Sequence, residues 1–437
     1  MTNSLRVGIA GLGTVGSSVI RLLDRQDRAL QARTGRKIVV TAVSARDKSR
    51  DRGVDLSGAT WFDDPVELAA SNEIDLFVEL VGGDEGIARK AVETALASGK
   101  SVVTANKALL AKHGMALAKL AEDKRVALAF EASVAGGIPI VKTLREGLAG
   151  NEISRVYGIL NGTCNYILSR MEREGISFDA CLADAQRLGY AEADPTFDID
   201  GFDTAHKLAI LTSLAFGTCV DAEAIHIEGI RAITLDDLRS ADELGYRIKL
   251  LGVAQRTDEG IEQRVHPTMV PKSSAIAQVM GVTNAVTIDA DAVKELTLVG
   301  PGAGGEATAS AVVADISDVA RGIRSAPFGL PIASLEMAPR RAMQRHEGGY
   351  YIRLAVRDRP GAAANIAMRM AERNISLESI MQKSAGRGRS AGATGEPVQV
   401  VLLTYATTEA NIREALEAAV GDGYIAEKPQ VIRIERE

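Results

Sequence analysis

A carboxylate-rich loop that runs into a lysine lies between residues 189 and 207. Pro195 and Gly201 predict a loop for its first part, whereas the apolar residues that follow recur at helical spacing. On that helix Asp203 and Lys207 are i,i+4 neighbours on one face. This pair and the acids before it could bind a small polar amine or hydroxyl and transfer a proton. Taken alone, the residues fit a solvated acidic loop with a surface ion pair equally well. The acids of the stretch are Glu192, Asp194, Asp198, Asp200 and Asp203.

A glycine-rich loop at 11–16 follows an apolar strand candidate at 5–10 and precedes a helical pattern from residue 17. A second β-branched run occupies 37–44, and this order is the context that a GxGxxG dinucleotide-binding loop requires. The first glycine permits the tight turn, the second lets the backbone approach a pyrophosphate, and the third lets helix and strand pack closely. The helix N-terminus offers free N–H groups to the anion. The candidate cofactor-binding residues here are Gly11, Gly13, Thr14, Val15 and Gly16.

The end of the second predicted strand indicates which dinucleotide binds. An acidic residue there would bond the ribose 2′-hydroxyl of NAD. Arg46 and Lys48 occupy this region instead, and both could bind a 2′-phosphate, which favours NADP. Asp47 leaves NAD open, and a solvated charged turn is the alternative interpretation.

Strands and helices alternate as far as residue 132, which predicts an α/β fold with a Rossmann-type doubly wound parallel sheet. Ligands of such sheets bind beyond the carboxyl ends of the strands. Gly83, Asn106, Lys107 and Glu131 all fall at predicted strand ends. A lysine at a helix start is electrostatically disfavoured, so we expect Lys107 to face the cofactor and the substrate.

Residues 131–139 form a second unusual loop, in which the carboxylate of Glu131 precedes an irregular glycine-rich backbone. Ligation by oxygen atoms alone suits a hard cation. With a single carboxylate, a monovalent ion fits better than Ca²⁺. On the residues alone, an ordinary turn is the better interpretation.

The chain of 437 residues is long enough for two to four domains. The dinucleotide-binding domain is predicted at 1–150 and is completed by about 305–340, where a helix follows another glycine-rich loop. In that loop Gly302 and Gly304 suit close approach to the cofactor, or simply a turn. Residues 151–304 mix short strands with helices, which predicts an α+β catalytic and dimerisation domain.

From residue 350 the pattern restarts and runs to 437 in the order βαββαβ, which is typical of a ferredoxin-like domain. The segment 384–397 is rich in Gly, Ser and Arg and predicts a flexible hairpin loop.

Composition excludes several classes of protein. A net charge of −6 with mixed signs argues against a nucleic-acid binder. No apolar run approaches the ~18 residues of a membrane span, and the strand-like start gives no sign of a signal peptide. Three cysteines without a CxxC pair indicate reduced thiols in a cytoplasmic protein.

Six motifs together resemble those of the homoserine dehydrogenase family. They are GLGTVG at 11–16, TANK at 104–107, EASVAGGIP at 131–139, NGTCNYI at 161–167, GYAEADPTFDIDGFDTAHK at 189–207 and GPGAGG at 300–305. The resemblance covers about residues 1–340. It implies reduction of L-aspartate 4-semialdehyde to L-homoserine with NADPH or NADH, in the biosynthesis of threonine, methionine and isoleucine.

The resemblance also implies roles for single residues. Lys207 would be the proton donor, Asp203 would support it, and Lys107 would lie in the same site. Acids at Glu192 and Asp198 would hold the substrate's ammonium group. This chemistry fits the residues independently, because hydride reduction of an aldehyde leaves an alkoxide that needs a proton, and general acid catalysis contributes roughly 10²–10⁴ in rate.

Two further ligand sites complete the expected active site. The substrate's carboxylate needs hydrogen-bond donors, and Thr163 with nearby backbone N–H groups could supply them. The family's monovalent cation, Na⁺ or K⁺, would be bound by one carboxylate and three main-chain carbonyls. The implied ligands are Glu131, Val134, Gly136 and Ile138.

The turn Arg357-Asp-Arg-Pro-Gly361, between a predicted strand and helix, resembles the ACT-type regulatory domain. Such domains commonly bind small amino acids, so we expect feedback inhibition by L-threonine through residues 350–437. A dimerisation module without a ligand is the alternative. We expect a homodimer or homotetramer.

Two rival functions remain open at this point: another amino-acid dehydrogenase on this scaffold, and a nicotinamide sensor that signals through the C-terminal domain. The presence of both Lys107 and Lys207 beside several acids argues against the sensor, which would need no proton donor.

Overall fold

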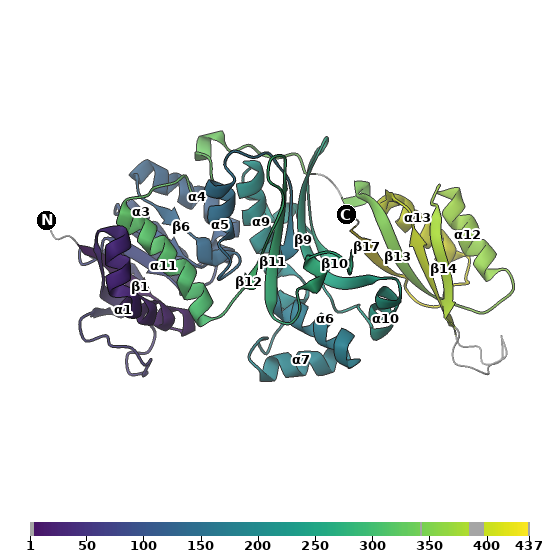
Figure 1. Cartoon of the computed structure of the whole chain (residues 1–437), viewed down its shortest axis with the longest axis horizontal. Coiled ribbons are helices and arrows are strands. Elements are labelled where there is room, and N and C mark those ends of the chain that lie inside the picture. The colour runs from purple at the N-terminus through teal and green to yellow at the C-terminus, as the bar shows by residue number, and fades with distance from the viewer. Residues whose placement is uncertain (1–3, 341–342, 384–396, 436–437) are drawn as a thin grey trace.

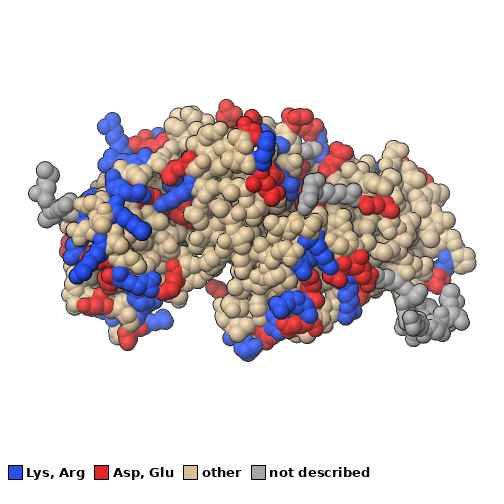
Figure 2. Space-filling model, viewed as in Figure 1, with Lys and Arg blue, Asp and Glu red and all other residues tan. Residues whose placement is uncertain are grey.

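The computed structural model describes residues 4–340, 343–383 and 397–435. Three domains follow one another along the longest axis, with the nucleotide domain at one end and the C-terminal domain at the other (Figure 1). Apart from Pro397, the hairpin loop predicted at 384–397 lies outside the described residues. On the face shown in Figure 2, basic and acidic side chains are intermixed.

The first sheet is parallel throughout and has the order β3-β2-β1-β4-β5-β6, so the predicted doubly wound sheet is confirmed. Residues of β4 are buried on both faces, as expected for a strand covered by helices on each side. The strands are β1 (Ser4–Ala10), β2 (Lys37–Ser44), β3 (Thr60–Phe62), β4 (Leu76–Glu79), β5 (Ser101–Thr104) and β6 (Leu128–Ala129).

The last of these strands is shorter than the sequence indicated. The alternation predicted from the sequence extends its last strand to residue 132, but Glu131–Ser133 forms a turn of 3-10 helix. Both the backbone N–H and the hydroxyl of Ser133 donate to the carbonyl of Phe130, which ends the extended conformation.

Helices cover both faces of this sheet. They are α1 (Thr14–Thr34), α2 (Pro65–Ala70), α3 (Ile87–Ala97) and α4 (Lys107–Lys124), joined by α11 (Gly305–Arg321) from much later in the chain. Helix α11 packs along α1, as Figure 1 shows, so the chain returns to the nucleotide domain after the catalytic domain.

The catalytic domain is built around a buried helix, α9 (Phe202–Phe216), which packs against β9 and α4. Gly201 before it (φ +93°) and Gly217 after it (φ +67°) have left-handed backbones, which set its two ends. The other helices of the domain are α6 (Gly162–Glu174), α7 (Phe178–Arg187), α8 (Thr196–Ile199) and α10 (Leu235–Glu243). Its strands are β7 (Ile153–Ile159), β8 (His226–Ile227), β9 (Tyr246–Thr257), β10 (Gly260–Pro271), β11 (Thr283–Ala290) and β12 (Lys294–Pro301).

The C-terminal domain has the predicted βαββαβ order, with its own core between the sheet and two helices. Its elements are β13 (Glu347–Val356), α12 (Ala362–Glu372), β14 (Leu377–Lys383), β15 (Val398–Thr404), α13 (Glu409–Gly421) and β17 (Gln430–Ile434). A short strand, β16 (Thr407–Thr408), pairs with β13.

The catalytic and C-terminal domains share one sheet. Its order is β12-β11-β7-β9-β10-β17-β13-β15-β14, because β17 pairs with β10 in parallel, with Thr268 opposite Arg433. The sequence did not predict this join. Within the described ranges, no helix has the length and apolar character needed to cross a membrane.

Candidate active site

Two lysines from different domains meet at one buried carboxylate. Lys207 on α9 places Nζ 2.7 Å from Oδ2 of Asp203, one helical turn earlier. Lys107, the first residue of α4, places Nζ 3.1 Å from the other oxygen, Oδ1. The structure therefore brings together the three predicted catalytic residues where the nucleotide and catalytic domains meet. Figure 2 shows the molecule hollowed between the nucleotide domain and the lobe of α6 and α7.

Burial and neighbouring charges together set the pKa of Asp203 in this cluster. Asp203 is only 4% exposed. Burial alone would raise the pKa of Asp203, but the ammonium groups of Lys207 and Lys107 outweigh it and hold that pKa well below its ordinary value. Lys207 also donates to the carbonyl of Leu160 at 2.7 Å. An ammonium has three N–H donors, so one donor of Lys207 remains for a ligand.

Asn161, which no sequence pattern marked as a site residue, lies in the middle of this cluster. Its side-chain N–H₂ donates to Asp198 at 2.9 Å and to Asp203 at 2.8 Å. Its side-chain oxygen caps α6 by accepting the N–H of Cys164. One amide therefore connects the carboxylate that bonds both lysines, Asp203, to Asp198, the acid predicted to bind the substrate. Its place in the NGTCNYI motif was the only signal in the sequence.

The two acids predicted to hold the substrate's ammonium lie in different surroundings. Asp198, on α8, is half-buried, and burial and the neighbouring Asp203 raise its pKa. An approaching ammonium would reverse that shift. Glu192 is exposed, and no described contact of its side chain ties it to this cluster. Thr163 is buried, and its hydroxyl donates to the carbonyl of Tyr190 at 2.7 Å.

The glycine loop after β1 has the geometry of a pyrophosphate cradle. A Cβ on Gly11 would lie 2.4 Å from the carbonyl of Leu80, and one on Gly16 would lie 2.0 Å from that of Gly11. A Cβ on Gly13 would meet open space, so the backbone is accessible there. Thr14 is exposed at the start of α1 and Val15 is half-buried. The residues present therefore fit a dinucleotide.

The second glycine-rich loop, at 300–305, packs against the first. Gly304 has φ +116° and leads into α11, and a Cβ on Gly305 would lie 2.9 Å from Thr14. Gly302 is packed so tightly that a Cβ would lie 2.0 Å from the side chain of Asn284. The three predicted loops adjoin here, because a Cβ on Gly136 would lie 2.4 Å from the carbonyl of Gly302.

Asn106 and Glu79, to which we assigned no role from the sequence, organise the backbone after strands β4 and β5. Asn106 caps α4 by accepting the N–H of Leu109, and its side-chain N–H₂ donates to the carbonyl of Gly83 at 2.7 Å. The fully buried Glu79 accepts the N–H groups of the two residues before Gly83. These bonds connect Gly83 to the helix start that carries Lys107.

The segment after β2 leaves Arg46 and Lys48 exposed. The carboxylate of Asp47, which could have bound a 2′-hydroxyl, instead accepts from the N–H and hydroxyl of Ser49 at 2.9 and 2.7 Å. Arg52, which the sequence analysis overlooked, donates to the carbonyl of Leu12 in the glycine loop at 3.2 Å. The segment thus presents cations beside the dinucleotide cradle.

The predicted cation loop is tightly built around Glu131, which is 2% exposed. Its two carboxylate oxygens accept the N–H groups of Val141 and Lys142, each at 2.8 Å. Burial and the nearby Asp315 raise the pKa of Glu131 to about 7. Ile138 already accepts the N–H of Ile140.

The carboxylate of Asp315 on α11 acts on that of Glu131, and the ligands predicted for a monovalent cation are all oxygen atoms. Val134 and Ile138 are both buried, and Gly136 holds φ +56°. Within residues 4–340, 343–383 and 397–435, no group of three or more His, Cys, Asp or Glu side chains could hold a metal ion.

Comparison with family models gives three matches along the chain. Residues 11–131 match the model described as homoserine dehydrogenase, NAD binding domain, and 139–317 match homoserine dehydrogenase. Residues 350–421 match the ACT domain.

Individual relatives agree with these matches. A homoserine dehydrogenase of Neisseria gonorrhoeae is 44% identical over 438 residues, covering 99% of this chain and 98% of the relative. The crystal structure of a homoserine dehydrogenase from Thiobacillus denitrificans superposes with a TM-score of 0.92 at 44% identity, covering 99% and 98% of the two chains. A hyperthermophilic archaeal homoserine dehydrogenase mutant, solved in complex with NADPH, is 29% identical with a TM-score of 0.63. It covers 73% of this chain and 98% of its own.

Proposed function

The chain belongs to the homoserine dehydrogenase family of NAD(P)-dependent oxidoreductases that act on a CH–OH group. On that premise we propose that it reduces L-aspartate 4-semialdehyde to L-homoserine, on the route to threonine, methionine and isoleucine. The observation that carries this proposal is the buried Asp203, held between Lys107 and Lys207 beside a dinucleotide cradle.

Lys207 is the proton donor in this proposal. When bound, the nicotinamide supplies a hydride to the aldehyde carbon. The substrate oxygen then takes up a proton, and the remaining N–H of Lys207 can deliver it. Asp203 stays ionised and keeps a negative charge 2.7 Å from the ammonium, which orients Lys207. Lys107 donates to the same carboxylate and helps to position the substrate.

Asp198 and Glu192 bind the substrate's ammonium, Asp198 from its half-buried position on α8 and Glu192 from the exposed loop before it. Asn161 holds Asp198 and Asp203 at a fixed separation through one side-chain amide. The N–H groups at the start of α6 serve the substrate's carboxylate, because a helix N-terminus favours an anion. The hydroxyl of Thr163 would join them only on releasing the carbonyl of Tyr190.

NADP is the proposed cofactor, with the 2′-phosphate bound by Arg46 and Lys48. The cations beside the cradle and the occupied carboxylate of Asp47 support this preference. The NADPH complex of the archaeal relative is consistent with it. A monovalent cation bound by Glu131 and the carbonyls of Val134, Gly136 and Ile138 would fix the loop that packs against Gly302.

The C-terminal domain is proposed to mediate feedback inhibition by L-threonine, supported by its match to the ACT domain. Removing the whole domain is a poor test of this regulation. Strand β17 pairs with β10, and Glu435 accepts from the buried Arg264 at 2.6 Å, so truncation would deprive β10 of a neighbouring strand in the shared sheet and remove one of the two carboxylates that bond this arginine.

A panel of semialdehydes assayed with NADPH and NADH, following the absorbance of the reduced nicotinamide, tests the proposed function. L-aspartate 4-semialdehyde should give the highest kcat/KM, with L-homoserine as the product identified by mass spectrometry. If another semialdehyde gave the highest kcat/KM, that compound would be the substrate instead. If no semialdehyde were reduced with either cofactor, the proposed reaction would be refuted.

A further inference from the structure

The turn that follows β2 is folded around the guanidinium of Arg52. Its Nη1 donates to the carbonyl of Arg50 at 2.6 Å and its Nη2 donates to the carbonyl of Asp47, both within the same turn. Its Nε donates to the carbonyl of Leu12 at 3.2 Å, in the glycine loop that forms the dinucleotide cradle. All three nitrogens of the guanidinium thus bond the main chain. Arg52 therefore holds the turn closed and keeps it at a set distance from the cradle.

Trp61, the only tryptophan of the chain, lies beside the same turn. It belongs to β3, where it is opposite Val43 of β2. The Nζ of Lys48 is 5.9 Å from the centre of its ring, and the guanidinium carbon of Arg52 is 5.6 Å from it. A cation within about 6 Å of an aromatic ring is attracted to it. One ring therefore contacts both the cation that closes the turn and one of the two cations proposed to bind the 2′-phosphate.

The two acids of the turn bond its own backbone. The carboxylates of Asp47 and Asp51 each accept the N–H group of the residue two positions further on, at 2.9 and 2.8 Å. Arg46 and Lys48 are exposed, and in the described part of the chain neither has an ion-pair partner. The turn therefore presents positive charge in a fixed shape, which suits a phosphate group.

We propose that Arg52 and Trp61 are positioning residues for cofactor selection. They hold the turn 46–52 in the shape that binds the 2′-phosphate, without contacting the phosphate themselves. The proposal rests on the NADP preference included in the proposed function and adds the residues on which that preference depends. A turn that is already folded loses less conformational freedom on binding than a mobile one. Because Arg52 also bonds Leu12, it sets the distance from the phosphate-binding cations to the pyrophosphate cradle.

Arg52→Lys separates the shape of the turn from its charge. Lysine keeps the positive charge, but its single nitrogen cannot bond three carbonyls as the planar guanidinium does. Arg50→Lys is the matched control, because Arg50 is exposed in the same turn and bonds Arg52 only through its main-chain carbonyl. Trp61→Leu removes the aromatic ring, whereas Trp61→Phe keeps one at that position.

The dissociation constants of NADPH and NADH measure the effect directly, with each cofactor titrated into the full-length variants and followed by the fluorescence of the reduced nicotinamide. Arg52→Lys should raise the dissociation constant of NADPH about tenfold and that of NADH about twofold or less, whereas Arg50→Lys should match the unaltered chain. Trp61→Leu should shift the two constants in the same unequal way, and Trp61→Phe should restore most of the loss. In steady-state assays KM for NADPH should rise with its dissociation constant.

A role confined to the stability of the fold would weaken the binding of both cofactors alike. Equal increases for NADPH and NADH in Arg52→Lys and Trp61→Leu would therefore overturn the proposal. NADPH binding like that of the unaltered chain would also overturn it, while Arg46 and Lys48 would stand as phosphate ligands if Arg46→Glu still weakens NADPH binding. If the unaltered chain binds NADPH no better than NADH, the cofactor preference itself fails, and this inference fails with it. Thermal unfolding shows which variants are folded, and the comparison of Trp61→Phe with Trp61→Leu decides the question if Arg52→Lys does not fold.

Discussion

Replacing Lys207 by alanine separates proton donation from binding. In the structure Lys207 is 9% exposed and sits between Asp203 and the carbonyl of Leu160, so water cannot easily take its place. Losing a general acid should reduce kcat about 10²–10⁴-fold, or about 3–5 kcal/mol of barrier. Affinity for the cofactor should change little, because the glycine loop at 11–16 belongs to the other domain.

Stability must be measured alongside the rate. Breaking a buried ion pair costs about 3–5 kcal/mol when the remaining charge has no partner, but Asp203 keeps Lys107 at 3.1 Å and Asn161 at 2.8 Å. We therefore expect a folded variant with a lowered melting temperature, which thermal unfolding will show. Lys207→Ala with kcat near that of the unaltered chain would refute the proton-donor role.

Lys107→Ala is the comparison that tells the two lysines apart. The side chain of Lys107 is 33% exposed and bonds only one oxygen of Asp203. Its loss should raise KM for the semialdehyde more than it lowers kcat. If instead Lys107→Ala loses kcat by orders of magnitude and Lys207→Ala does not, the roles of the two lysines are reversed.

Three further outcomes follow from particular side chains. Arg46→Glu should raise KM for NADPH much more than for NADH, and equal effects in steady-state assays would show that Arg46 does not contact the 2′-phosphate. Potassium or sodium should stimulate activity and Glu131→Ala should abolish the stimulation; rates indifferent to both ions across a salt series would contradict a cation there. Burial lowers the pKa of Lys249 to about 8, with Glu172 opposing and Arg247 adding to the shift. The folded chain therefore releases this proton more readily than the unfolded one, and the free energy of unfolding should rise from about pH 8 to 10 by roughly 3 kcal/mol or less relative to Lys249→Met. Parallel pH profiles of denaturant unfolding for the two chains would contradict this.

The parts of the fold predicted from sequence rest on local patterns. The strand, glycine loop and helix around Gly11 are consecutive in the chain, from Ser4 to Thr34. The glycines indicate their own role, because only glycine tolerates a carbonyl 2.4 Å from the position of a Cβ. Asp203 and Lys207 share one turn of a helix, so their pairing also follows from spacing alone. Lys107 could be placed at a strand end, but no local pattern shows that it reaches Asp203 from another domain.

Contacts over long sequence distances could not be predicted in this way. Asn161 reaches acids 37 and 42 residues away, and its apparent local role is only that of a helix cap. Glu192 looked equivalent to Asp198 in sequence, yet Asp198 bonds Asn161 from helix α8, whereas Glu192 is exposed on the loop before that helix. The early end of β6 depends on bonds to Phe130 that no alternation of apolar residues records.

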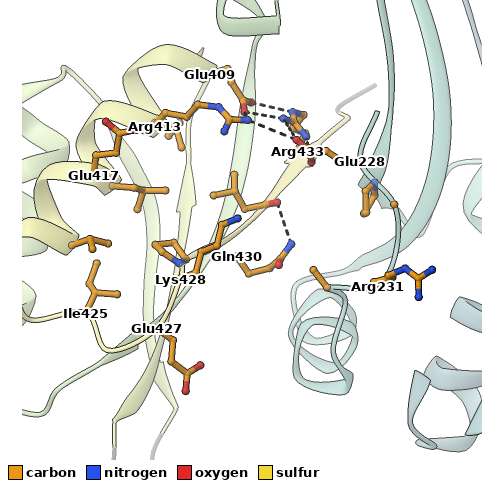
Figure 3. Close-up of a pocket in the computed structure, with 18 of the residues that line it drawn as sticks. Glu228, Arg231, Glu409, Arg413, Glu417, Ile425, Glu427, Lys428, Gln430 and Arg433 are labelled. Carbon is orange, nitrogen blue, oxygen red and sulfur yellow. Dashed lines mark hydrogen bonds and ion pairs between the residues drawn. The ribbon is translucent and has the colours of Figure 1, made fainter. Parts of the chain in front are cut away.

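The join of β10 and β17 has the largest consequence for function. An edge strand can pair with any neighbouring strand whose backbone groups are free. For this reason the apolar pattern of β17 does not reveal that its partner, β10, lies in another domain. Buried charge also lies at the join, because Arg264, 1% exposed, bonds Glu435, the residue that directly follows β17. Separating the two domains would break these bonds together. The C-terminal domain therefore stays attached when it shifts slightly, and its shift is passed on to the catalytic domain. The bonds from Arg433 to Glu228 connect a displacement of that domain directly to the catalytic domain (Figure 3).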